Sequence, residues 1–574
     1  MELVNSGPPP KVIRTTTTEP CFKVAKNEDV VVRPTAKFHP SVWGDYFITN
    51  PSLPSTHQEE QIKQRVQVLV EDVKVLLKDA KGSMREEMQL IDALQRLGVA
   101  YHFEQEINEA LCFINTTSSS EQHSYSDDDL HFVALQFRLL RQHHYYVPPD
   151  VFNQFINDKG KFKEEMSNDL NGLLSLYEAA YLGIPGEDRL DEAIDFTRSH
   201  LQSLAKHIGP RLARKVKHAL ETPLRRRMSR LNARLYIAIY EEDIETRNDV
   251  VLELAKLDFH ILQLLHREEV KMISMWWKDL SVPTKLTFAR DRIVELYFWI
   301  LGVYFEPHYS RARLMLVKVL AMFSLMDDIY DSYGTMAELL HFTNAIQRWD
   351  LKAADEMEEC IQVVFLAIYH TIGEIEDEVL KDDKLYRIGY LRREFEKMTI
   401  AWLEEAKWRD DCYLPSLAEH LELSIRTTGY HAIACASFLG MGEIAGKESF
   451  DWATSFPQIS KDISKISRLM DDVVGYEIDN KMERNHVVST IHCCMNEFGD
   501  SLEEAKERLL QMVEDAWKDV NQECLHLTIP YALLARFVNL ASMMETMYKN
   551  TDGYTQPSLL KNSISLLLVQ PILC

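Results

Sequence analysis

Three aspartates, Asp327, Asp328 and Asp331, form the run DDIYD directly after an almost wholly apolar segment, residues 314–326. That segment predicts a buried helix. If the helix continues, Asp327 and Asp331 lie one turn apart on the same face, with Asp328 beside them. Carboxylates gathered at the end of a buried helix repel one another and resist desolvation unless a cation joins them. Hard oxygen ligands of this kind suit Mg²⁺, which retains waters and binds one or two carboxylates plus substrate phosphates.

The alternative interpretation of DDIYD is a solvated helix end, as for most acidic pairs. The chain offers its own comparison, because Asp382-Asp383 and Asp410-Asp411 lack both a preceding apolar helix and an acid three residues on. The DDIYD run has both features. It therefore favours a metal site over a solvated end.

A second acidic helix is predicted in ISKISRLMDDVVGYEID, residues 463–479. Asp471, Gly475 and Asp479 are spaced i, i+4 and i+8, which puts them in one column over two turns. Such a column can hold a metal ion if it faces the first cluster. A solvated acidic face remains the alternative on spacing alone.

Arginines occur in the same two regions. Arg290 and Arg292 in FARDR precede the first cluster, and Arg468 lies about one turn before Asp471. A guanidinium group is always charged and binds phosphate oxygens bidentately. Each arginine alone is as compatible with a surface position or a salt bridge.

The elements that must position these residues are predicted to be helices. Apolar residues recur at three- and four-residue steps from about residue 62 to 240 and again from about 250 onward, without a sustained alternating pattern. Glycine is scarce, with 20 in 574 residues, which is typical of a helical chain. We therefore expect an all-α protein with two helical domains that divide near residues 230–255.

Composition excludes several classes of function. The formal net charge of −24 argues against a nucleic-acid partner and against an anionic membrane surface. No apolar run approaches the ~20 residues that a membrane-spanning helix needs. Residues 1–32 contain a proline triplet, a threonine run and several acids, which predicts a disordered segment rather than a transit peptide. Nine scattered cysteines fit a reducing compartment. We expect a cytoplasmic location.

From residue 33 onward the chain resembles the plant class I terpene synthases, in their cytosolic sesquiterpene synthase branch. Segments typical of the N-terminal domain of that family are RPTAKFHPSVWGDYF (33–47) and ALQFRLLRQHHYYV (134–147). Segments typical of its catalytic domain are LAKLDFHILQLLHREE, WWKDL, FWILGVYFEP and DGYT. The resemblance implies a two-domain all-α fold: a relict N-terminal α-barrel domain over residues 33–245 and a C-terminal class I α-helical bundle over residues 246–574.

The resemblance also assigns roles to the charged residues. Asp327, Asp328 and Asp331 match the first metal motif, and Asp471, Gly475 (through water) and Asp479 match the second. Together these motifs bind Mg²⁺, normally three ions with Mn²⁺ as a substitute, which hold the diphosphate of a prenyl substrate. Asp327 and Asp331 thus also contact the diphosphate, and Arg290, Arg292 and Arg468 take it as it departs.

Further residues match parts of the family's pocket. Trp299 corresponds to a pocket tryptophan, and Asp552 and Tyr554 to a late active-site loop. With Arg290, these are the catalytic residues that the resemblance implies. Thr427, Thr428 and Gly429 match a broken helix that faces the pocket. An apolar, closed pocket suits the chemistry, because water would quench a carbocation and aromatic faces stabilise one.

The implied activity is that of a carbon–oxygen lyase. It ionises farnesyl diphosphate, cyclises or rearranges the carbocation, and releases diphosphate and a sesquiterpene. Arg33-Pro34 replaces the tandem arginine typical of monoterpene synthases, which favours a C15 substrate. In the second motif Gly475 stands where a hydroxyl is usual and Asp479 where glutamate is usual, so we expect Asp479 to bind metal more weakly. A monomer is expected.

Several alternatives stay open. They are a monoterpene synthase on geranyl diphosphate, a prenyl-chain-elongating transferase, and an inactive helical scaffold. Gly475 argues against the elongating enzymes, which normally carry a second DDxxD. A protonation-initiated cyclase would need DxDD, which the run at residues 127–129 does not provide. A di-iron bundle would need paired ExxH helices, which the two acidic helices lack.

Overall fold

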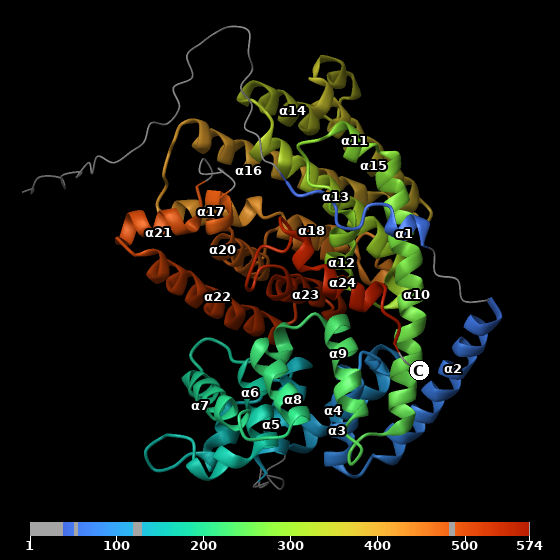
Figure 1. Cartoon of the computed structure of the whole chain (residues 1–574), viewed down its shortest axis with the longest axis vertical. Coiled ribbons are helices and arrows are strands. Elements are labelled where there is room, and N and C mark those ends of the chain that lie inside the picture. Colours follow the sequence, from blue (N-terminus) through green and yellow to red (C-terminus); the bar gives the residue numbers. More distant parts are fainter. Residues whose placement is uncertain (1–37, 51–55, 119–128, 482–487, 573–574) are drawn as a thin grey trace, which may run out of the picture.

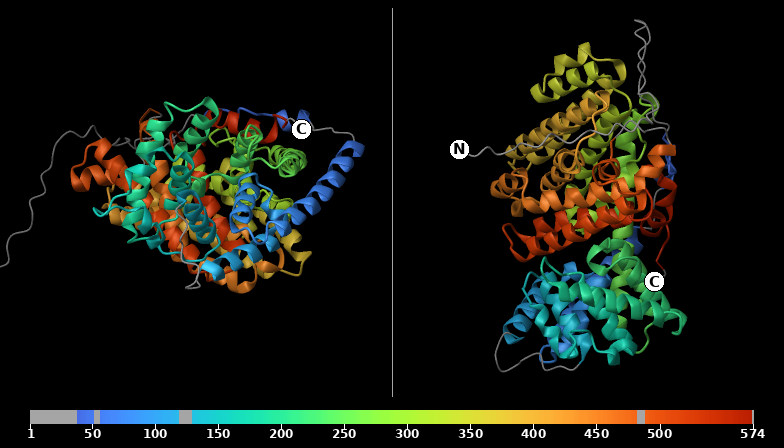
Figure 2. Two further views of the ribbon diagram at one scale, coloured as in Figure 1. Left: turned by 90° about the horizontal axis from the view of Figure 1, so that it is seen from below. Right: turned by 90° about the vertical axis from the view of Figure 1, so that its left-hand side faces the viewer.

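The computed structural model describes residues 38–50, 56–118, 129–481 and 488–572. Within these ranges the chain is helical and forms no β-strand, only an isolated bridge between Ile156 and Phe162. The helices form two lobes stacked along the long axis of the molecule (Figures 1 and 2). The prediction of a two-domain all-α fold is therefore confirmed. The segment predicted to be disordered, residues 1–32, lies outside the described residues.

The lower lobe in Figure 1 consists mainly of helices from the first half of the chain. They are α2 (Thr56–Asp79), α3 (Met84–Arg96), α4 (Glu104–Ser118), α5 (Leu130–Gln142), α6 (Leu170–Ala180), α7 (Asp188–Leu204), α8 (Pro210–Glu221) and α9 (Ser229–Glu241). Apolar side chains such as Leu139 and Leu176 fill the space between them and are fully buried. Burial of these apolar faces is what holds the helices together.

The upper lobe is larger and surrounds a central group of buried helices. Its elements are α10 (Asp249–Asp279), α11 (Val282–Lys285), α12 (Ile293–Val303), α13 (Ser310–Ser332), α14 (Met336–Arg348), α15 (Glu359–Leu380), α16 (Tyr386–Asp410), α17 (Leu417–Thr427), α18 (Tyr430–Ser437), α19 (Lys447–Thr454), α20 (Gln458–Lys481), α21 (Thr490–Phe498), α22 (Leu502–Leu525), α23 (Tyr531–Met547) and α24 (Lys561–Leu568). α12 and α13 are apolar on nearly every side, as expected for helices enclosed by others.

Helices near both ends of the described chain connect the two lobes. The short helix α1 (Tyr46–Thr49) packs on α10 of the upper lobe, where Lys278 forms a 2.7 Å ion pair with Asp45. α2 also packs on α10, and α24 contacts both α9 and α10. Because α10 contacts helices of both lobes, the domain boundary at residue 245 stays a prediction. That residue lies in the turn between the end of α9 and the start of α10.

Charged groups also join the lobes. Arg226, in the 3-10 turn η4 (Leu224–Arg226), donates two hydrogen bonds of 2.6 Å to Glu514 of α22. Its guanidinium lies over the rings of Tyr181 and Trp517, at 4.9 Å and 5.0 Å from their centroids. Asn521, one turn beyond Trp517 on α22, donates to the main-chain carbonyl of Tyr181. Bidentate pairing with cation–π stacking fixes orientation as well as distance.

A buried ion pair positions the helix that ends in DDIYD. Arg313 of α13 donates two 2.7 Å hydrogen bonds to Glu269 of α10, which also accepts a 2.7 Å bond from the hydroxyl of Tyr297 on α12. All three side chains are buried. The pair therefore fixes the register of α13 against α10 and α12.

We expect Arg313→Met to lower the free energy of unfolding by about 3–5 kcal/mol, because Glu269 would keep a buried charge without its partner. The measurement is the midpoint of urea unfolding. Arg311→Met is the matched control on the same helix. Its ion pairs with Asp382 and Glu378 are at the surface, with 36% of the Arg311 side chain exposed, so the loss should stay below about 1 kcal/mol. Equal losses in both variants would contradict this role.

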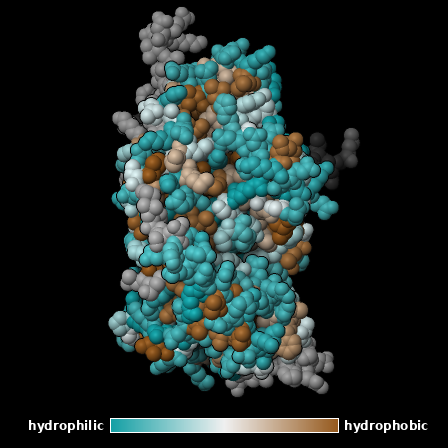
Figure 3. Space-filling model, turned by 90° about the vertical axis from the view of Figure 1, so that its right-hand side faces the viewer, coloured by the Kyte–Doolittle hydropathy of each residue, from teal (hydrophilic) through white to brown (hydrophobic). Residues whose placement is uncertain are grey.

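No helix in the described part of the chain is long and apolar enough to cross a membrane. The face shown in Figure 3 is predominantly hydrophilic, with small apolar patches scattered over both lobes.

Candidate active site

The carboxylates of the first motif differ in their surroundings. Asp328 is 1% exposed and Asp327 is 33% exposed at their side chains. Both are bound by Arg290, in the loop between α11 and α12. Its Nε donates to Asp328 at 2.7 Å, its main-chain N–H to the same carboxylate at 2.8 Å, and a terminal amino group to Asp327 at 2.5 Å. Burial opposes the charge on Arg290, but Asp328 and Asp327 outweigh it and raise the pKa of Arg290.

The second motif lies on α20. The Asp471 side chain is 35% exposed and lies 3.7 Å from Arg468. The adjacent Asp472 points elsewhere: it accepts hydrogen bonds of 2.6 Å from the main-chain N–H and the hydroxyl of Thr490, which starts α21. Gly475 is buried one turn beyond Asp471. Asp479 follows on the same helix, but its side chain lies outside the described residues.

Residues from both motifs line one cavity. The sequence-predicted residues around it are Arg290, Trp299, Asp327, Thr427, Thr428, Gly429, Arg468, Asp471 and Tyr554. These positions come from α12, α13, α17, α20 and three loops, spread over 265 residues of sequence from Arg290 to Tyr554. The structure therefore gathers acids, arginines and apolar residues around one space. Asp328, Asp331, Arg292, Gly475 and Asp552 are not among its lining residues.

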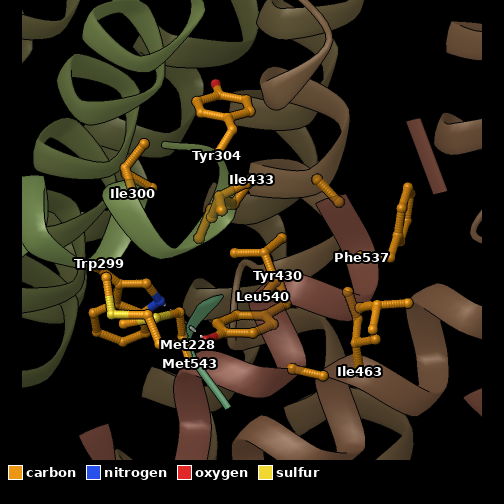
Figure 4. Close-up of a cluster of buried hydrophobic side chains, with 14 of the residues drawn as sticks. Met228, Trp299, Ile300, Tyr304, Tyr430, Ile433, Ile463, Phe537, Leu540 and Met543 are labelled. Atoms are coloured by element: carbon orange, nitrogen blue, oxygen red, sulfur yellow. Dashed lines mark hydrogen bonds between the residues drawn. The ribbon is translucent and has the colours of Figure 1, made fainter. Parts of the chain in front are cut away.

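Aromatic rings form one wall of the cavity. Trp299 meets Tyr554, Tyr548 and Tyr430 edge-on, at centroid distances of 5.8, 6.0 and 6.3 Å, and its indole N–H donates to the Tyr430 hydroxyl at 3.2 Å. Figure 4 shows Trp299 and Tyr430 close together beside Met543. Ring faces in such a wall can stabilise a cationic ligand without bonding to it.

Sequence reasoning missed four of the lining aromatics: Tyr430, Tyr548, Phe323 and Trp402. Phe323, Trp402 and Tyr430 stand in helices and Tyr548 directly follows α23, positions where an aromatic residue is ordinary core packing. No local signal distinguishes them. Their role depends on helices that meet only in the tertiary structure.

A break between α17 and α18 forms another side of the cavity. Gly429 has a φ of 70°, a left-handed conformation that glycine adopts without strain, and it ends the hydrogen-bonded run. The carbonyl of Thr427 accepts a 3.1 Å bond from the Trp402 indole. Thr428 and Gly429 line the cavity at this break.

Glu405 on α16 is a further acidic residue that the sequence did not single out. It accepts a 2.8 Å hydrogen bond from the Thr427 hydroxyl. Burial, together with the nearby charges of Asp331 and Asp327, raises the pKa of Glu405 to about 8, although Arg468 opposes the shift. The carboxyl thus lies between the two motifs. In sequence it is one of two adjacent glutamates in a helix, which carries no signal.

Arg292 and Asp552 hold the loop that carries Tyr554. Arg292 donates to the main-chain carbonyls of Tyr554 at 2.9 Å and His39 at 2.7 Å. One oxygen of Asp552 accepts from the main-chain N–H groups of Tyr554 and Thr555, at 2.9 and 2.8 Å. The Tyr554 hydroxyl is 2.5 Å from that of Ser324 on α13. Arg292 and Asp552 thus bind the backbone of this loop from two sides.

The donor set fits a hard divalent cation. Among the described residues no three Asp, Glu, His or Cys side chains lie close enough to hold a metal by themselves. Mg²⁺ does not require this, because it binds through one or two carboxylates plus waters and substrate phosphates. The partly exposed Asp327 and Asp471 supply such oxygens on two sides of the cavity.

We expect Glu405→Gln to stabilise the metal-free chain at high pH. A half-buried carboxyl whose pKa is raised from 4.5 to about 8 destabilises the fold progressively as pH rises through that window. The gain, about 1–3 kcal/mol, should therefore be full above pH 8 and absent below pH 4.5. The measurement is thermal unfolding in EDTA across this range. The neighbouring Glu404, which is exposed and paired with Lys407, gives the control Glu404→Gln. Equal pH profiles for the two variants would refute the assignment.

A helical lobe with two acidic motifs and two arginines around an aromatic cavity defines a metal-dependent enzyme for an anionic substrate with an apolar body. Residues 42–220 match the family described as "Terpene synthase, N-terminal domain", and residues 278–519 match "Terpene synthase family, metal binding domain". The chain belongs to the terpene synthase family, whose members are lyases acting on prenyl diphosphates. The prediction of the family is confirmed.

Individual relatives agree over nearly the full length. The chain is 45% identical to (-)-germacrene D synthase of Vitis vinifera, covering 94% of this chain and 96% of that protein. It is also 45% identical to alpha-humulene synthase of Zingiber zerumbet, covering 95% and 98%. Among solved structures, isoprene synthase from grey poplar (Populus x canescens), in complex with three Mg²⁺ ions and dimethylallyl-S-thiolodiphosphate, aligns with a TM-score of 0.84 at 33% identity, covering 93% and 99%.

Proposed function

We propose that this chain is a sesquiterpene synthase. It ionises farnesyl diphosphate, guides cyclisation or rearrangement of the carbocation, and releases diphosphate and a sesquiterpene. The observation that carries the proposal is the single cavity that Asp327 and Asp471 share with the aromatic residues around Trp299. Its acidic part suits a metal-bound diphosphate, and its aromatic part suits a C15 chain. Two relatives with 45% identity are named for sesquiterpene products, which supports the choice of substrate.

We assign the metal-holding role to the two motifs. Asp327 and Asp331 would bind Mg²⁺ on one side, with Asp328 behind them. Asp471, water at Gly475, and Asp479 would bind it on the other side. The three ions in the isoprene synthase complex support a set of three here, with Mn²⁺ as a substitute. When bound, the ions supply positive charge that stabilises the departing diphosphate.

The arginines at the cavity would bind the same diphosphate. Arg290 and Arg468 both line the space and both contact motif carboxylates in this structure. A phosphate oxygen can replace a carboxylate oxygen on either guanidinium. We therefore assign diphosphate binding to these two residues. Arg292 would act on the reaction indirectly, by holding the loop that carries Tyr554.

The apolar wall would govern the fate of the carbocation. Trp299, Tyr430 and Tyr554 present rings to the cavity, and the loop held by Arg292 and Asp552 fixes the last of these. Rings attract a cation electrostatically without adding a nucleophile to it. Thr427, Thr428 and Gly429 add backbone dipoles at the break. We further propose that the protein acts as a monomer in the cytoplasm.

The direct test is to incubate the purified protein with Mg²⁺ and either farnesyl or geranyl diphosphate and to identify volatile products by gas chromatography with mass detection. We expect C15 products from farnesyl diphosphate and a loss of at least about 100-fold in rate for Asp327→Asn, because one metal-facing charge is removed. Diphosphate release without a C15 product would reject the sesquiterpene assignment. Products from geranyl diphosphate alone would favour a monoterpene synthase, and products longer than the substrate an elongating enzyme. The absence of any product from either substrate would favour the inactive helical scaffold.

Asp479 offers a separate test of the second motif. Asp479→Ala should raise the Mg²⁺ concentration that gives half-maximal rate by about tenfold, because a carboxylate proposed to bind the metal is lost. Asp479→Glu, which restores the longer acid usual in the family, should lower it below the value for the unaltered chain. An unchanged Mg²⁺ dependence in Asp479→Ala would sink the assignment.

A further inference from the structure

A second polar cavity lies in the other lobe, away from the site described above. It has a volume of about 60 Å³ and is enclosed by α3, α5, α6, α8 and α9, which cluster in the lower lobe of Figure 1. Charged residues dominate its lining: Asp92 and Arg96 from α3, Glu178 from α6, Lys215 from α8, and Arg227 after η4. The proposed terpene synthase chemistry uses none of them.

The carboxylates of this cavity already have partners. Asp92 accepts a 2.7 Å hydrogen bond from Arg96 and is also bound by Arg138. Glu178 accepts a 2.9 Å bond from Arg227. Four guanidinium or ammonium groups, those of Arg96, Arg138, Arg227 and Lys215, thus stand against two carboxylates. The cluster carries an excess of positive charge.

Lys215 is the cation left over. Within residues that the structure describes, its ammonium group forms no ion pair and no hydrogen bond. The next acid nearby, Asp243, pairs with Arg211 at 2.9 Å. Burial and the charge of Arg96 lower the pKa of Lys215, although Asp92 and Asp243 oppose the shift. Burying a charge without a partner is costly, so a site of this kind favours an anion.

Other donors face the same space. Arg96 uses its Nε for Asp92, and its two terminal amino groups have no protein acceptor in the described part of the chain. His131 lines the cavity and is 2.6 Å from the Ser175 hydroxyl through Nδ1, so its Nε2 is the nitrogen left for a ligand. Lys215 and Arg96 present donors from two helices, and Nε2 of His131, on a third helix, is a donor when its Nδ1 accepts from Ser175. Such a convergent set suits an oxyanion.

We propose that this cavity binds one small tetrahedral oxyanion of the phosphate class, held by Lys215, Arg96 and His131. Its size supports this class. A water molecule needs roughly 10–15 Å³ of such volume, so about 60 Å³ accommodates about five small atoms, as in phosphate or sulfate. Inorganic diphosphate, with nearly twice as many atoms, is too large. The ligand therefore differs from the diphosphate that the catalytic lobe is proposed to release.

Isothermal titration of the full-length protein with sodium phosphate, in EDTA and at constant ionic strength set with chloride, tests the proposal. We expect one phosphate per chain, with sulfate binding comparably and diphosphate binding at least about tenfold more weakly. Lys215→Met should weaken phosphate binding at least about tenfold, and Lys215→Arg should retain it within about threefold. Lys217→Met, an exposed lysine on the same helix paired with Glu221, is the matched control and should bind like the unaltered chain.

Two outcomes would overturn the proposal. One is the absence of phosphate binding to the unaltered chain, which would mean that the cavity holds only water. The other is phosphate binding that survives in Lys215→Met but is lost in Arg290→Gln, which would assign it to the catalytic lobe. If Lys215→Met loses its helical circular dichroism, His131→Gln serves as the second variant, with an expected weakening of about threefold. An unaltered affinity in a folded His131→Gln would remove that residue from the site.

Discussion

The repulsion between carboxylates at the end of a buried helix is the constraint around which this structure is arranged. Asp327 and Asp328 end an apolar helix in the centre of the upper lobe, where unbalanced negative charge is costly. In this structure Arg290 compensates that charge by binding both carboxylates. The same excess of negative charge makes the position suitable for divalent cations. A single electrostatic requirement therefore accounts for both the resting contacts and the proposed metal site.

The rest of the upper lobe serves to keep that helix in place and its surroundings dry. Arg313 and Glu269 fix the register of α13 deep in the core. Arg292 ties the loop of Tyr554 to the segment around His39, so that residues from both ends of the chain meet beside the cavity. These contacts involve fully buried guanidinium groups whose donors are taken up by protein oxygens. They give the site rigidity that apolar packing alone would not supply.

The lower lobe shows a different use of buried charge. Its polar cavity is lined by more cations than carboxylates, whereas the lining of the catalytic cavity balances Arg290 and Arg468 against Asp327 and Asp471. Arg226 and Glu514 link the two lobes through a pair stacked between Tyr181 and Trp517. The lobes are thus joined by oriented charge as well as by apolar contact. The cavity of the lower lobe can therefore favour an anion, although the chain as a whole is acidic.

Local pattern in the sequence was sufficient to predict the all-α fold, and the resemblance of segments along most of the chain was sufficient to predict the family. Helix periodicity and the apolar run before Asp327 involve only residues that are close in sequence, so they can be identified without knowledge of tertiary contacts. The i, i+4, i+8 column from Asp471 is equally local, although spacing could not say which cavity it would face. The scarcity of glycine and the lack of a sustained alternating pattern likewise identified the fold class. In each case the physical cause lies within a few helical turns.

Only the tertiary structure decided how these parts act together. Arg290 binds both Asp327 and Asp328, but only Asp327 lines the cavity, because one step along a helix rotates a side chain by about 100°. The tertiary structure also brought in Glu405 and Tyr430 from helices with no distinguishing pattern. The sequence by itself determined which residues could do the chemistry. Long-range packing determined which of them share a cavity, since that depends on contacts between helices hundreds of residues apart.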